Sequence, residues 1–514
     1  MDFVEIIPSV RKYEWGRRER GALTRVFYGN ARVAGSDQGR SVLEGEVENG
    51  NYVNRERLSE CRDDGLKGKE AVVASLGGGL GGFLGPDGEE EPYAELWYGS
   101  HVSSPSGVVF NGRFLEKMTL DDVISSEFGL EGPTRLPFLL KVLSISKPLS
   151  LQVHPDQVLA GKLHRSFPMI YPDDSHKPEI AIALTEFEAF CGFRDTLQIL
   201  SLLQSFPETL VIFGVSRDFI TQTIQTHKKD DTLVPPDHTK PDPLCSIKKD
   251  LFINMLNSKP ETTRAALDSL VQRLQLTSSS SLDDYTDQRR SDTALIESLI
   301  LRLHSHFPLD IGIICPILLH YYKLNPGDAL YIGAGTIHSY LSGECIECMA
   351  NSDNVVRCGL TPKLKDVPTL LQAVNFQLNN AKIFLHHTSF QEMSSTPLLI
   401  DYLVETVDEF HVQILSLHPQ DHSSSSQTSQ EQSGTSFSAP ESSPYSLLLC
   451  ISGGCHLSIT SPSSQVSRNI HSILQGRAIL VKPGTKISFS PLPSSSCTNS
   501  PTRFALVTLP KHKL

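Results

Sequence analysis

The sequence has 514 residues, of which 39% are hydrophobic and 20% are charged, and its formal net charge is −12. This composition is typical of a soluble globular protein with sizeable cores and about three domains. The negative charge argues against nucleic acid or an anionic membrane surface as a partner. No apolar run approaches the length that a membrane span requires, so we expect no transmembrane segment.

The sequence lacks signals for secretion and for disulfide bonding. Residues 1–8 contain two acids and no basic residue, which does not fit a signal peptide. The 10 cysteines are scattered, which indicates a reducing compartment. Cys345 and Cys348 form the only Cys-x-x-Cys pair, and without a second pair it does not predict structural zinc. We therefore expect a cytoplasmic protein.

The N-terminal part combines a short ordered start with a long irregular segment. Residues 1–28 predict a short strand and a turn, whereas residues from about 29 to 91 are rich in Gly, Ser, Glu and Arg and predict a flexible insertion. Within it, Gly77–Gly82 matches the Gly-x-Gly-x-x-Gly pattern of dinucleotide-binding turns. Because Pro86 follows closely, no helix can start there to bind a pyrophosphate, and we predict a loop.

Strand patterns give way to helical patterns in the middle of the chain. Strand-like stretches occur at 92–101, 137–145 and 187–193. From Asp195 to about Tyr322, leucine and isoleucine recur at helical spacing, which predicts a helical insertion. Two polar breaks within it, at 228–243 and 277–291, predict loops.

Strand patterns return in the C-terminal part. After a strand at 323–332, a glycine-rich bend over 333–338 presents His338. From about Phe376 the chain shows short strands separated by turn signals, which predicts a sandwich or jelly roll. A Ser/Gln-rich tract between His422 and Ser443 predicts a disordered surface loop. The whole sequence predicts a mainly β fold with an α-helical insertion.

Two short polar motifs could form most of a zinc site. Period-two alternation places Gln152 and His154 on one face of a strand, and Lys177 and Glu179 on one face of another. Two such strands could aim an imidazole, a carboxylate and an amide oxygen at one point. On spacing alone, a polar edge of a β-sheet without metal fits equally well.

His338 would complete the set, because it follows a strand and a glycine-containing turn, as a third ligand strand would. Two imidazoles, one carboxylate and one neutral oxygen would leave Zn²⁺ with a net charge near +1 and room for water or a substrate oxygen. Such a metal can act as a Lewis acid. Cysteine is absent from this set, which argues against a purely structural site.

Basic residues gather in the same stretches of the chain: Lys141, Lys177, Arg357 and Lys363. Against the negative total charge, this local excess predicts a site for a phosphate or another anion, although ordinary surface salt bridges are the alternative. Glu347 lies among apolar neighbours, where a carboxylate could be a catalytic base or part of a buried ion pair.

Several long motifs resemble type I mannose-6-phosphate isomerases, also called phosphomannose isomerases. The motifs that carry the resemblance are Pro92–Trp97, Leu136–Ser144, Leu149–Asp156, Lys177–Glu179, Ala189–Arg194 and Gly343–Lys363. They occur in the family's order and together are far more specific than any single short pattern. The resemblance covers nearly the whole chain apart from the 29–91 insertion and the serine-rich tract.

The resemblance implies two cupin-like (jelly-roll) domains and a helical domain. It places the first part of a cupin-like catalytic domain at 1–194, the helical insertion domain at 195–322, the second part of the catalytic domain at 323–375 and a C-terminal cupin-like domain at 376–514.

The resemblance also implies a zinc-dependent aldose–ketose isomerase that interconverts mannose 6-phosphate and fructose 6-phosphate through a cis-enediol intermediate. Such an enzyme would supply mannose 6-phosphate for GDP-mannose synthesis and protein glycosylation. One Zn²⁺ per chain and a phosphosugar substrate are implied, with neither nucleic acid nor membrane as a partner. A monomer is the default expectation.

Specific residues follow from the motif positions. The implied metal ligands are Gln152, His154, Glu179 and His338, and the implied catalytic arginine is Arg357. The family's substrate pocket maps to Lys141, Ser150, Lys177, Tyr340, Glu347 and Lys363. Among the pocket residues we prefer Glu347 as the base that moves the proton, because the step requires a carboxylate near the sugar carbons.

Some positions depart from the family pattern, and two other functions fit parts of the sequence. Gln157 stands where lysine is usual, and Cys358 and Val153 stand where alanine is usual. None of these changes removes an implied ligand, but Gln157 removes one possible phosphate contact. A non-catalytic cupin that senses a sugar phosphate and an iron oxygenase are the alternatives.

Overall fold

The computed structural model describes residues 3–19, 21–33, 47–48, 51–52, 91–111, 113–115, 118–127, 135–227, 242–278, 288–377, 381–385, 398–417, 435–462, 467–491 and 501–510. The predicted flexible insertion at 29–91 and the predicted loop at 228–243 lie largely outside these residues, as do most of the 277–291 and 422–443 segments. The chain divides into two compact units. Unit 1 comprises Met1–Ser144, Ile346–Asn351 and Thr388–Leu514, and unit 2 comprises Ile145–Cys345 and Ser352–His387.

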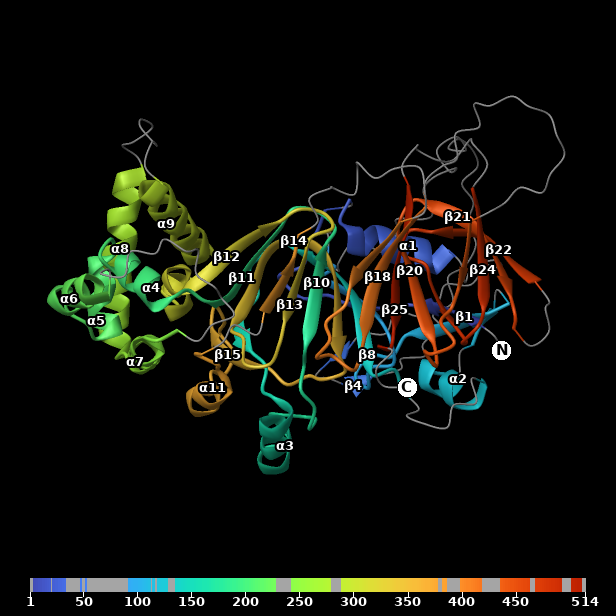
Figure 1. The fold of residues 1–514 in the computed structure, drawn as a ribbon, viewed down its shortest axis with the longest axis horizontal. Coiled ribbons are helices and arrows are strands. Elements are labelled where there is room, and N and C mark those ends of the chain that lie inside the picture. The colour runs from blue at the N-terminus through green and yellow to red at the C-terminus, as the bar shows by residue number, and fades with distance from the viewer. Residues whose placement is uncertain are drawn as a thin grey trace, which may run out of the picture. The chain divides into compact units, whose positions relative to one another are not determined.

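Unit 1 is built mainly of strands (Figure 1). Its N-terminal elements are β1 (Phe3–Ile7), β2 (Ser9–Arg11), α1 (Leu23–Val33), β3 (Val47–Glu48), β4 (Asn51–Tyr52), β5 (Glu95–Tyr98), β6 (Gly107–Phe110), β7 (Arg113–Phe114), α2 (Leu120–Glu127) and most of β8 (Phe138–Ile145). Its C-terminal elements are β17 (Leu398–Tyr402), β18 (His411–Leu417), β19 (Thr435–Ser438), β20 (Ser446–Ser452), β21 (Gly454–Thr460), β22 (Ser467–Leu474), β23 (Ala478–Val481), β24 (Lys486–Pro491) and β25 (Thr502–Thr508).

Two sheets of unit 1 share one hydrophobic core. Among the described residues, the first sheet has the strand order β17-β18-β25-β20-β23-β1-β6-β7 and the second has the order β19-β24-β21-β22. Leu448 and Phe504 of the first sheet belong to the same buried cluster as Ile459 and Ile487 of the second. The two sheets therefore form a sandwich, as the strand and turn pattern of the C-terminal part predicts.

Unit 2 combines strands with a group of helices. Its elements are β9 (Leu151–Val153), α3 (Gln157–Ser166), β10 (Glu179–Ala183), β11 (Phe187–Phe193), α4 (Thr196–Leu203), the 3₁₀ turn η1 (Pro207–Thr209), α5 (Leu210–Phe213), α6 (Arg217–His227), α7 (Cys245–Asn257), α8 (Pro260–Ser278), α9 (Gln288–His306), the 3₁₀ turn η2 (Ile311–Ile314), α10 (Cys315–Leu318), β12 (Leu319–Leu324), β13 (Ala329–Ile332), β15 (Val356–Gly359), α11 (Val367–Ala373) and β16 (Ala381–Phe384). The long strand β14 (His338–Ala350) begins in unit 2, and its last residues belong to unit 1.

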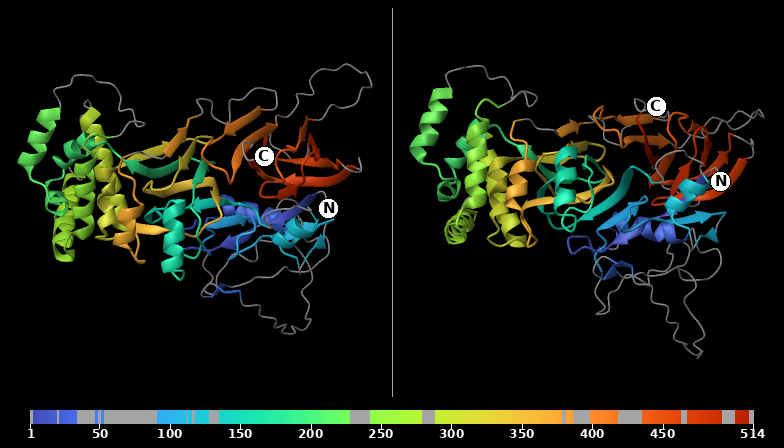
Figure 2. Two further views of the ribbon diagram at one scale, coloured as in Figure 1. Left: turned by 60° about the horizontal axis from the view of Figure 1, so that its bottom comes forward. Right: turned by 90° about the horizontal axis from the view of Figure 1, so that it is seen from below.

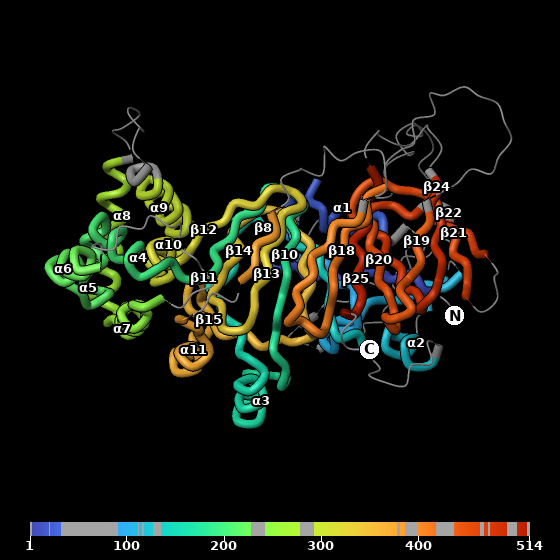
Figure 3. Tube along the Cα trace, in the orientation of Figure 1, coloured from blue at the N-terminus to red at the C-terminus, as the bar shows by residue number. Residues whose placement is uncertain are grey.

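The strands of unit 2 are paired in a way that brings distant segments together. β10 pairs with β13 and β13 with β16, while β11 pairs with both β12 and β14. The tube in Figure 3 shows β10, β13 and β14 running side by side. The short strand β9 pairs with β14 and with β15, so that Gln152 faces both His338 and Arg357, which lie far away in the sequence.

Helices α4–α10 of unit 2 gather in one group, which both views of Figure 2 show in green and yellow. Leu267, Leu270 and Leu274 of α8 are completely buried, and so are Ile300 and Leu303 of α9. Their spacing of three and four residues matches the helical periodicity in the sequence. The predicted helical insertion is confirmed by this arrangement.

Hydropathy identifies one further feature of these helices. Within the described part of the chain, no single helix is long and apolar enough to cross a membrane, but Thr196–Leu203 and Pro207–Phe213, bent by 108°, pass that test as a pair. Ile199, Leu203 and Phe213 of this pair are buried in the core of the helical group.

The predicted fold class is confirmed: the chain is mainly β with a helical insertion. Two expected boundaries are wrong. The helical stretch ends at Leu318 rather than near Tyr322, because Leu319–Leu324 pairs with β11 as strand β12. Within the predicted serine-rich loop, Thr435–Ser438 forms strand β19. Its backbone pairs with β24, and backbone hydrogen bonds do not depend on the polar side chains that predicted a loop. The division into four domain segments stays a prediction.

Candidate metal centre

Three strands of unit 2 carry the polar residues that the sequence motifs single out. Gln152 lies in β9, His154 directly follows that strand, Glu179 opens β10 and His338 opens β14. Gln152 is directly opposite His338 in the β9–β14 pair. Leu151 and Val153 are buried on the other face of β9, as the alternation predicts. Asp156 caps α3 by accepting from the Leu159 amide at 2.7 Å, so the chain turns into a helix immediately after His154.

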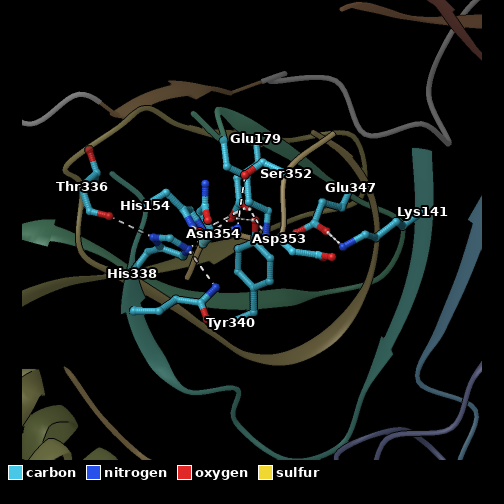
Figure 4. Close-up of polar contacts among 12 residues, drawn as sticks. Lys141, His154, Glu179, Thr336, His338, Tyr340, Glu347, Ser352, Asp353 and Asn354 are labelled. Carbon is cyan, nitrogen blue, oxygen red and sulfur yellow. Dashed lines mark hydrogen bonds and ion pairs between the residues drawn. The ribbon is translucent and has the colours of Figure 1, made fainter. Parts of the chain in front are cut away.

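His154, Glu179 and His338 form a compact buried group (Figure 4). His154 Nε2 lies 3.4 Å from Glu179 Oε2, and His338 Nε2 lies 3.1 Å from Glu179 Oε1. The potential ligand atoms all lie within 4.8 Å of one another. Each of the three side chains is only 1% exposed. The three sequence motifs are therefore brought to one point.

Backbone carbonyls fix the orientation of both imidazoles. The Nδ1–H group of His154 donates to the carbonyl oxygen of Asn354 at 2.7 Å, and that of His338 donates to the carbonyl oxygen of Thr336 at 2.9 Å. Because a carbonyl oxygen can only accept, each ring carries its proton on Nδ1. Both Nε2 atoms consequently face Glu179. This arrangement is typical of histidines that bind a metal through Nε2.

Burial and charge set the protonation of this group. Burial lowers the pKa of His154 to about 4, and the nearby charge of Lys177 acts in the same direction. Burial alone would raise the pKa of Glu179, but the charge of Lys177 and the interactions with the two histidines outweigh it, so that the pKa of this carboxyl lies well below its usual value. At neutral pH the group therefore offers a neutral imidazole and a carboxylate.

The donor set fits a divalent metal ion. His154 Nε2 and Glu179 Oε2 are buried side-chain atoms that make no hydrogen bond within the described residues. Leaving buried polar atoms unpaired costs about 1–3 kcal/mol each. A metal ion held between the two imidazoles and the carboxylate would satisfy both atoms, and the all-N/O set suits Zn²⁺ in a catalytic site.

Gln152 and Ser150 lie beside this group. Gln152 Nε2 is 3.4 Å from His338 Nε2, and Gln152 Oε1 accepts from the Ser150 hydroxyl at 3.1 Å. A half-turn of the amide about its last bond would exchange its nitrogen and oxygen and turn the oxygen toward the group. Gln152 is thus placed where a fourth ligand could act, although its role as a ligand stays a prediction.

Two predicted pocket residues contact Glu179 directly. The Tyr340 hydroxyl donates to Glu179 Oε1 at 3.1 Å, and Lys177 Nζ lies 3.6 Å from Glu179 Oε2. Both side chains are buried. The carboxylate is therefore held from two sides by groups other than the histidines.

Arg357 lies next to the ligands in the sheet, directly opposite Gln152 in the β9–β15 pair. Its side chain is half-buried, and burial lowers its pKa below the usual range. It forms no ion pair with any described residue, which leaves its fork of donors available to an anion. Lys363, which follows six residues later, is exposed and forms no ion pair within the described ranges.

Lys141 and Glu347 form a separate buried cluster in unit 1. Lys141 Nζ lies 2.9 Å from Glu347 Oε2 and 3.5 Å from Glu95 Oε2, and all three residues are buried. The indole of Trp97 donates to Glu95 at 2.5 Å, and Lys141 lies over its ring. Of the two interpretations of Glu347 in the sequence, the ion pair is present, and the role as a base stays a prediction.

Sequence patterns missed the residues that orient the ligands. Asn354 and Thr336 act through backbone carbonyls, which every residue possesses, so no residue-type pattern could identify them. Asp173 accepts hydrogen bonds from the 352–354 segment. Its only signal was its place in a polar run shortly before Lys177.

Comparison with known proteins identifies the family of the chain. The family models described as phosphomannose isomerase type I, catalytic domain, and phosphomannose isomerase type I, helical insertion domain, match residues 65–196 and 215–319. The mannose-6-phosphate isomerase of Schizosaccharomyces pombe is 37% identical over 319 residues, which cover 62% of this chain and 72% of the relative. The probable mannose-6-phosphate isomerase of Echinococcus multilocularis is 40% identical over 296 residues, or 55% of this chain and 64% of the relative.

The matched region leaves part of several relatives uncovered, and the solved structures support the fold. The matches span 62% of the Emericella nidulans enzyme and 64% of an Arabidopsis thaliana enzyme, both called mannose-6-phosphate isomerase. The structure of mannose 6-phosphate isomerase from Salmonella typhimurium bound to fructose 6-phosphate and zinc superposes with a TM-score of 0.61 at 24% identity, covering 99% of this chain and 100% of that chain. The resemblance inferred from the motifs is confirmed, and the chain belongs to the type I phosphomannose isomerase family.

Proposed function

We propose that this protein is a zinc-dependent isomerase that interconverts mannose 6-phosphate and fructose 6-phosphate. The observation that carries the proposal is the buried group of His154, Glu179 and His338, with both imidazoles fixed by carbonyls and two ligand atoms that make no hydrogen bond among the described residues. Membership of the family supports the reaction, and the solved Salmonella relative is described with fructose 6-phosphate and zinc bound.

Zinc would be held by His154, Glu179 and His338, with the amide oxygen of Gln152 as a fourth ligand. A bound zinc ion would supply Lewis-acid polarisation of a sugar oxygen. The carbonyls of Asn354 and Thr336 keep the two rings in the orientation that such binding needs. Because the ligands carry one negative charge in total, they leave a net positive charge that favours an anionic substrate.

The reaction moves a proton between C1 and C2 of the open-chain sugar phosphate through a cis-enediol. Glu347 is our candidate for the base that takes the proton from one carbon and returns it to the other. Arg357 would stabilise the negative charge that develops on the substrate oxygens, because its half-buried guanidinium has no ion-pair partner among the described residues. Lys177 and Lys363 are the candidates to bind the phosphate, and Lys177 is also a candidate to assist ring opening.

The remaining expectations concern the cellular context. We propose that the protein acts in the cytoplasm as a monomer, and that its product mannose 6-phosphate feeds GDP-mannose synthesis and protein glycosylation. The net charge of −12 and the scattered cysteines support a small-molecule partner in a reducing compartment.

The test is coupled turnover of mannose 6-phosphate to fructose 6-phosphate by the purified full chain. The protein would be assayed as isolated, after removal of metal with a chelator, and after addition of Zn²⁺ or Fe²⁺, with metal content measured in each sample. We expect activity to be lost on chelation and restored by zinc. Absence of turnover with zinc demonstrably bound would contradict the proposal, and restoration of the isomerase activity by iron alone would contradict zinc as its metal.

A further inference from the structure

A carboxylate outside the metal-binding group ties together two segments of unit 2. Asp173 Oδ1 accepts from the Ser352 hydroxyl at 2.8 Å, from Asn354 Nδ2 at 2.9 Å and from the Ser175 amide at 3.1 Å. Asp173 Oδ2 accepts from the Asp353 amide at 2.8 Å. One side chain thus fixes the three consecutive residues of the 352–354 segment, all of which Figure 4 labels.

The 352–354 segment contains the carbonyl group that accepts a hydrogen bond from the candidate metal ligand His154. Asn354 is completely buried, and its Nδ2 group also donates to the backbone carbonyls of Asp173 at 2.8 Å and Ser175 at 3.0 Å. Its own carbonyl accepts from Nδ1 of His154 at 2.7 Å. A continuous chain of hydrogen bonds therefore runs from Asp173 through Asn354 to His154.

We infer that Asp173 is a positioning residue of the metal centre, and this inference rests on the proposed function. Asp173 holds the Asn354 carbonyl against His154, and that contact keeps the ring proton on Nδ1 and the Nε2 lone pair toward Glu179. Without the contact, the imidazole is free to place its proton on Nε2 or to rotate, and either change removes a lone pair from the ligand set.

The geometry predicts a graded response to substitution. In Asp173→Asn, the amide oxygen can still accept from Ser352 and Asn354, but the amide nitrogen would meet the Asp353 N–H group, and two donors cannot bond. The 352–354 segment should therefore be held less firmly, although the asparagine side chain fills the same space as the aspartate. Asp174→Asn is the matched control, because this neighbouring side chain is exposed and makes no hydrogen bond or ion pair with the described residues.

The experiment measures zinc affinity of the full chain by competition with a chromophoric chelator. We expect Asp173→Asn to bind zinc about 10- to 100-fold more weakly than the unaltered protein, the range typical of lost partners behind a metal ligand. Asp174→Asn should bind zinc as the unaltered protein does. Equal affinity in Asp173→Asn would overturn the inference. If the unaltered chain bound no zinc, the proposed metal centre itself would fail, which is a distinguishable result.

A second readout separates positioning from general destabilisation. The ¹⁵N chemical shifts of the His154 ring in metal-free protein report which nitrogen carries the proton, and a His154→Gln variant assigns the signals. We expect Nδ1 protonation in the unaltered chain and a mixture of tautomers in Asp173→Asn. A weakened affinity with an unchanged tautomer would also overturn the inference. Should Asp173→Asn fail to fold, Ser352→Ala removes one bond to the carboxylate, and unchanged zinc affinity and tautomer there would overturn it instead.

Discussion

At the scale of single residues, the metal-binding group and the Lys141 cluster differ in how their buried charges are neutralised. Glu179 carries the negative charge of a buried group in which burial lowers the pKa of His154 to about 4, so a metal cation compensates that charge well. Lys141 instead lies between two buried carboxylates, Glu95 and Glu347, and its single positive charge serves both. The contact with Lys141, 2.9 Å from Glu347 Oε2, fixes the position of the carboxylate that we propose as the base.

Replacement of Glu347 by Gln tests that role. The amide keeps the size of the side chain and an oxygen to accept from Lys141, but it cannot take up a proton from carbon. We expect zinc content to be unchanged, because Glu347 is not among the candidate ligands, and exchange of the substrate C2 proton with solvent to slow by about 10²-fold or more. Proton exchange is measured by NMR in deuterated solvent.

The control for this variant is Glu95→Gln, which alters the other carboxylate that contacts Lys141 at 3.5 Å. If loss of charge near Lys141 were the cause of the slower exchange, both variants would slow equally. Exchange at the normal rate in Glu347→Gln would assign the base to another residue.

The sequence predicted which residues lie at the site better than it predicted the hydrogen bonds that these residues make. Alternation in Gln152–His154 and the bend before His338 placed side chains that the structure brings together. Gln157 was expected only to remove a phosphate contact, yet its amide donates to the Asp174 carbonyl at 2.7 Å and accepts from the His176 amide at 3.1 Å. A contact between a side chain and a distant backbone leaves no periodic pattern, which is why it could not be predicted.

At the scale of elements, strand β15 is fixed from both ends by carboxylates. Before the strand, Asp173 holds the 352–354 segment. After it, Asp310 Oδ1 accepts from the Leu360 amide and from the Gly312 amide, both at 2.7 Å. Leu360 has a φ of 54°, a conformation that costs energy for a residue with a side chain and needs surrounding bonds to hold it. Arg357 therefore lies in a short strand whose ends are both fixed.

Substitution of Asp310 tests the C-terminal anchor. Asp310→Ala leaves two buried amides without an acceptor, and we expect the free energy of unfolding to fall by about 2–4 kcal/mol. Asp310→Asn is the matched control, because its oxygen can still accept both bonds and only the ion pair to Lys365, 3.5 Å away, is lost. Urea unfolding of both variants measures the difference. Equal stability of the two variants would show that the hydrogen bonds accepted by Asp310 do not contribute to the free energy of unfolding.

The helices and strands that were not predicted correctly from the sequence share a physical cause. Long periodic segments such as α8 and α9 were predicted because a buried stripe repeats along them. Short elements such as β19 and α3 depend on partners far away in the chain or on a cap, and their own side chains carry little periodicity. The end of the helical stretch was misplaced for the same reason, since Leu319 continues an apolar run across the change from helix to strand.

At the scale of the whole molecule, each unit has its own hydrophobic core, while the candidate ligands belong to unit 2 alone. Gln152, His154, Glu179 and His338 all lie within Ile145–Cys345. The sandwich of unit 1 is held by its own buried cluster, which includes Leu448 and Phe504. Zinc binding should accordingly stabilise the strands that carry the ligands more than it stabilises the sandwich.

Hydrogen exchange followed by mass spectrometry tests this division in the intact chain with and without zinc. A ligand that binds only the folded state stabilises it by about 2.7 kcal/mol at a hundredfold excess over its dissociation constant, which slows the exchange of amides that open with the site about 100-fold. We expect this protection in β9, β10, β15 and the first residues of β14, with β20 and β25 unchanged. A His154→Gln variant should lose the protection. Equal slowing in β20 and β25 would mean that the two units open together, so that metal bound to unit 2 stabilises the entire fold.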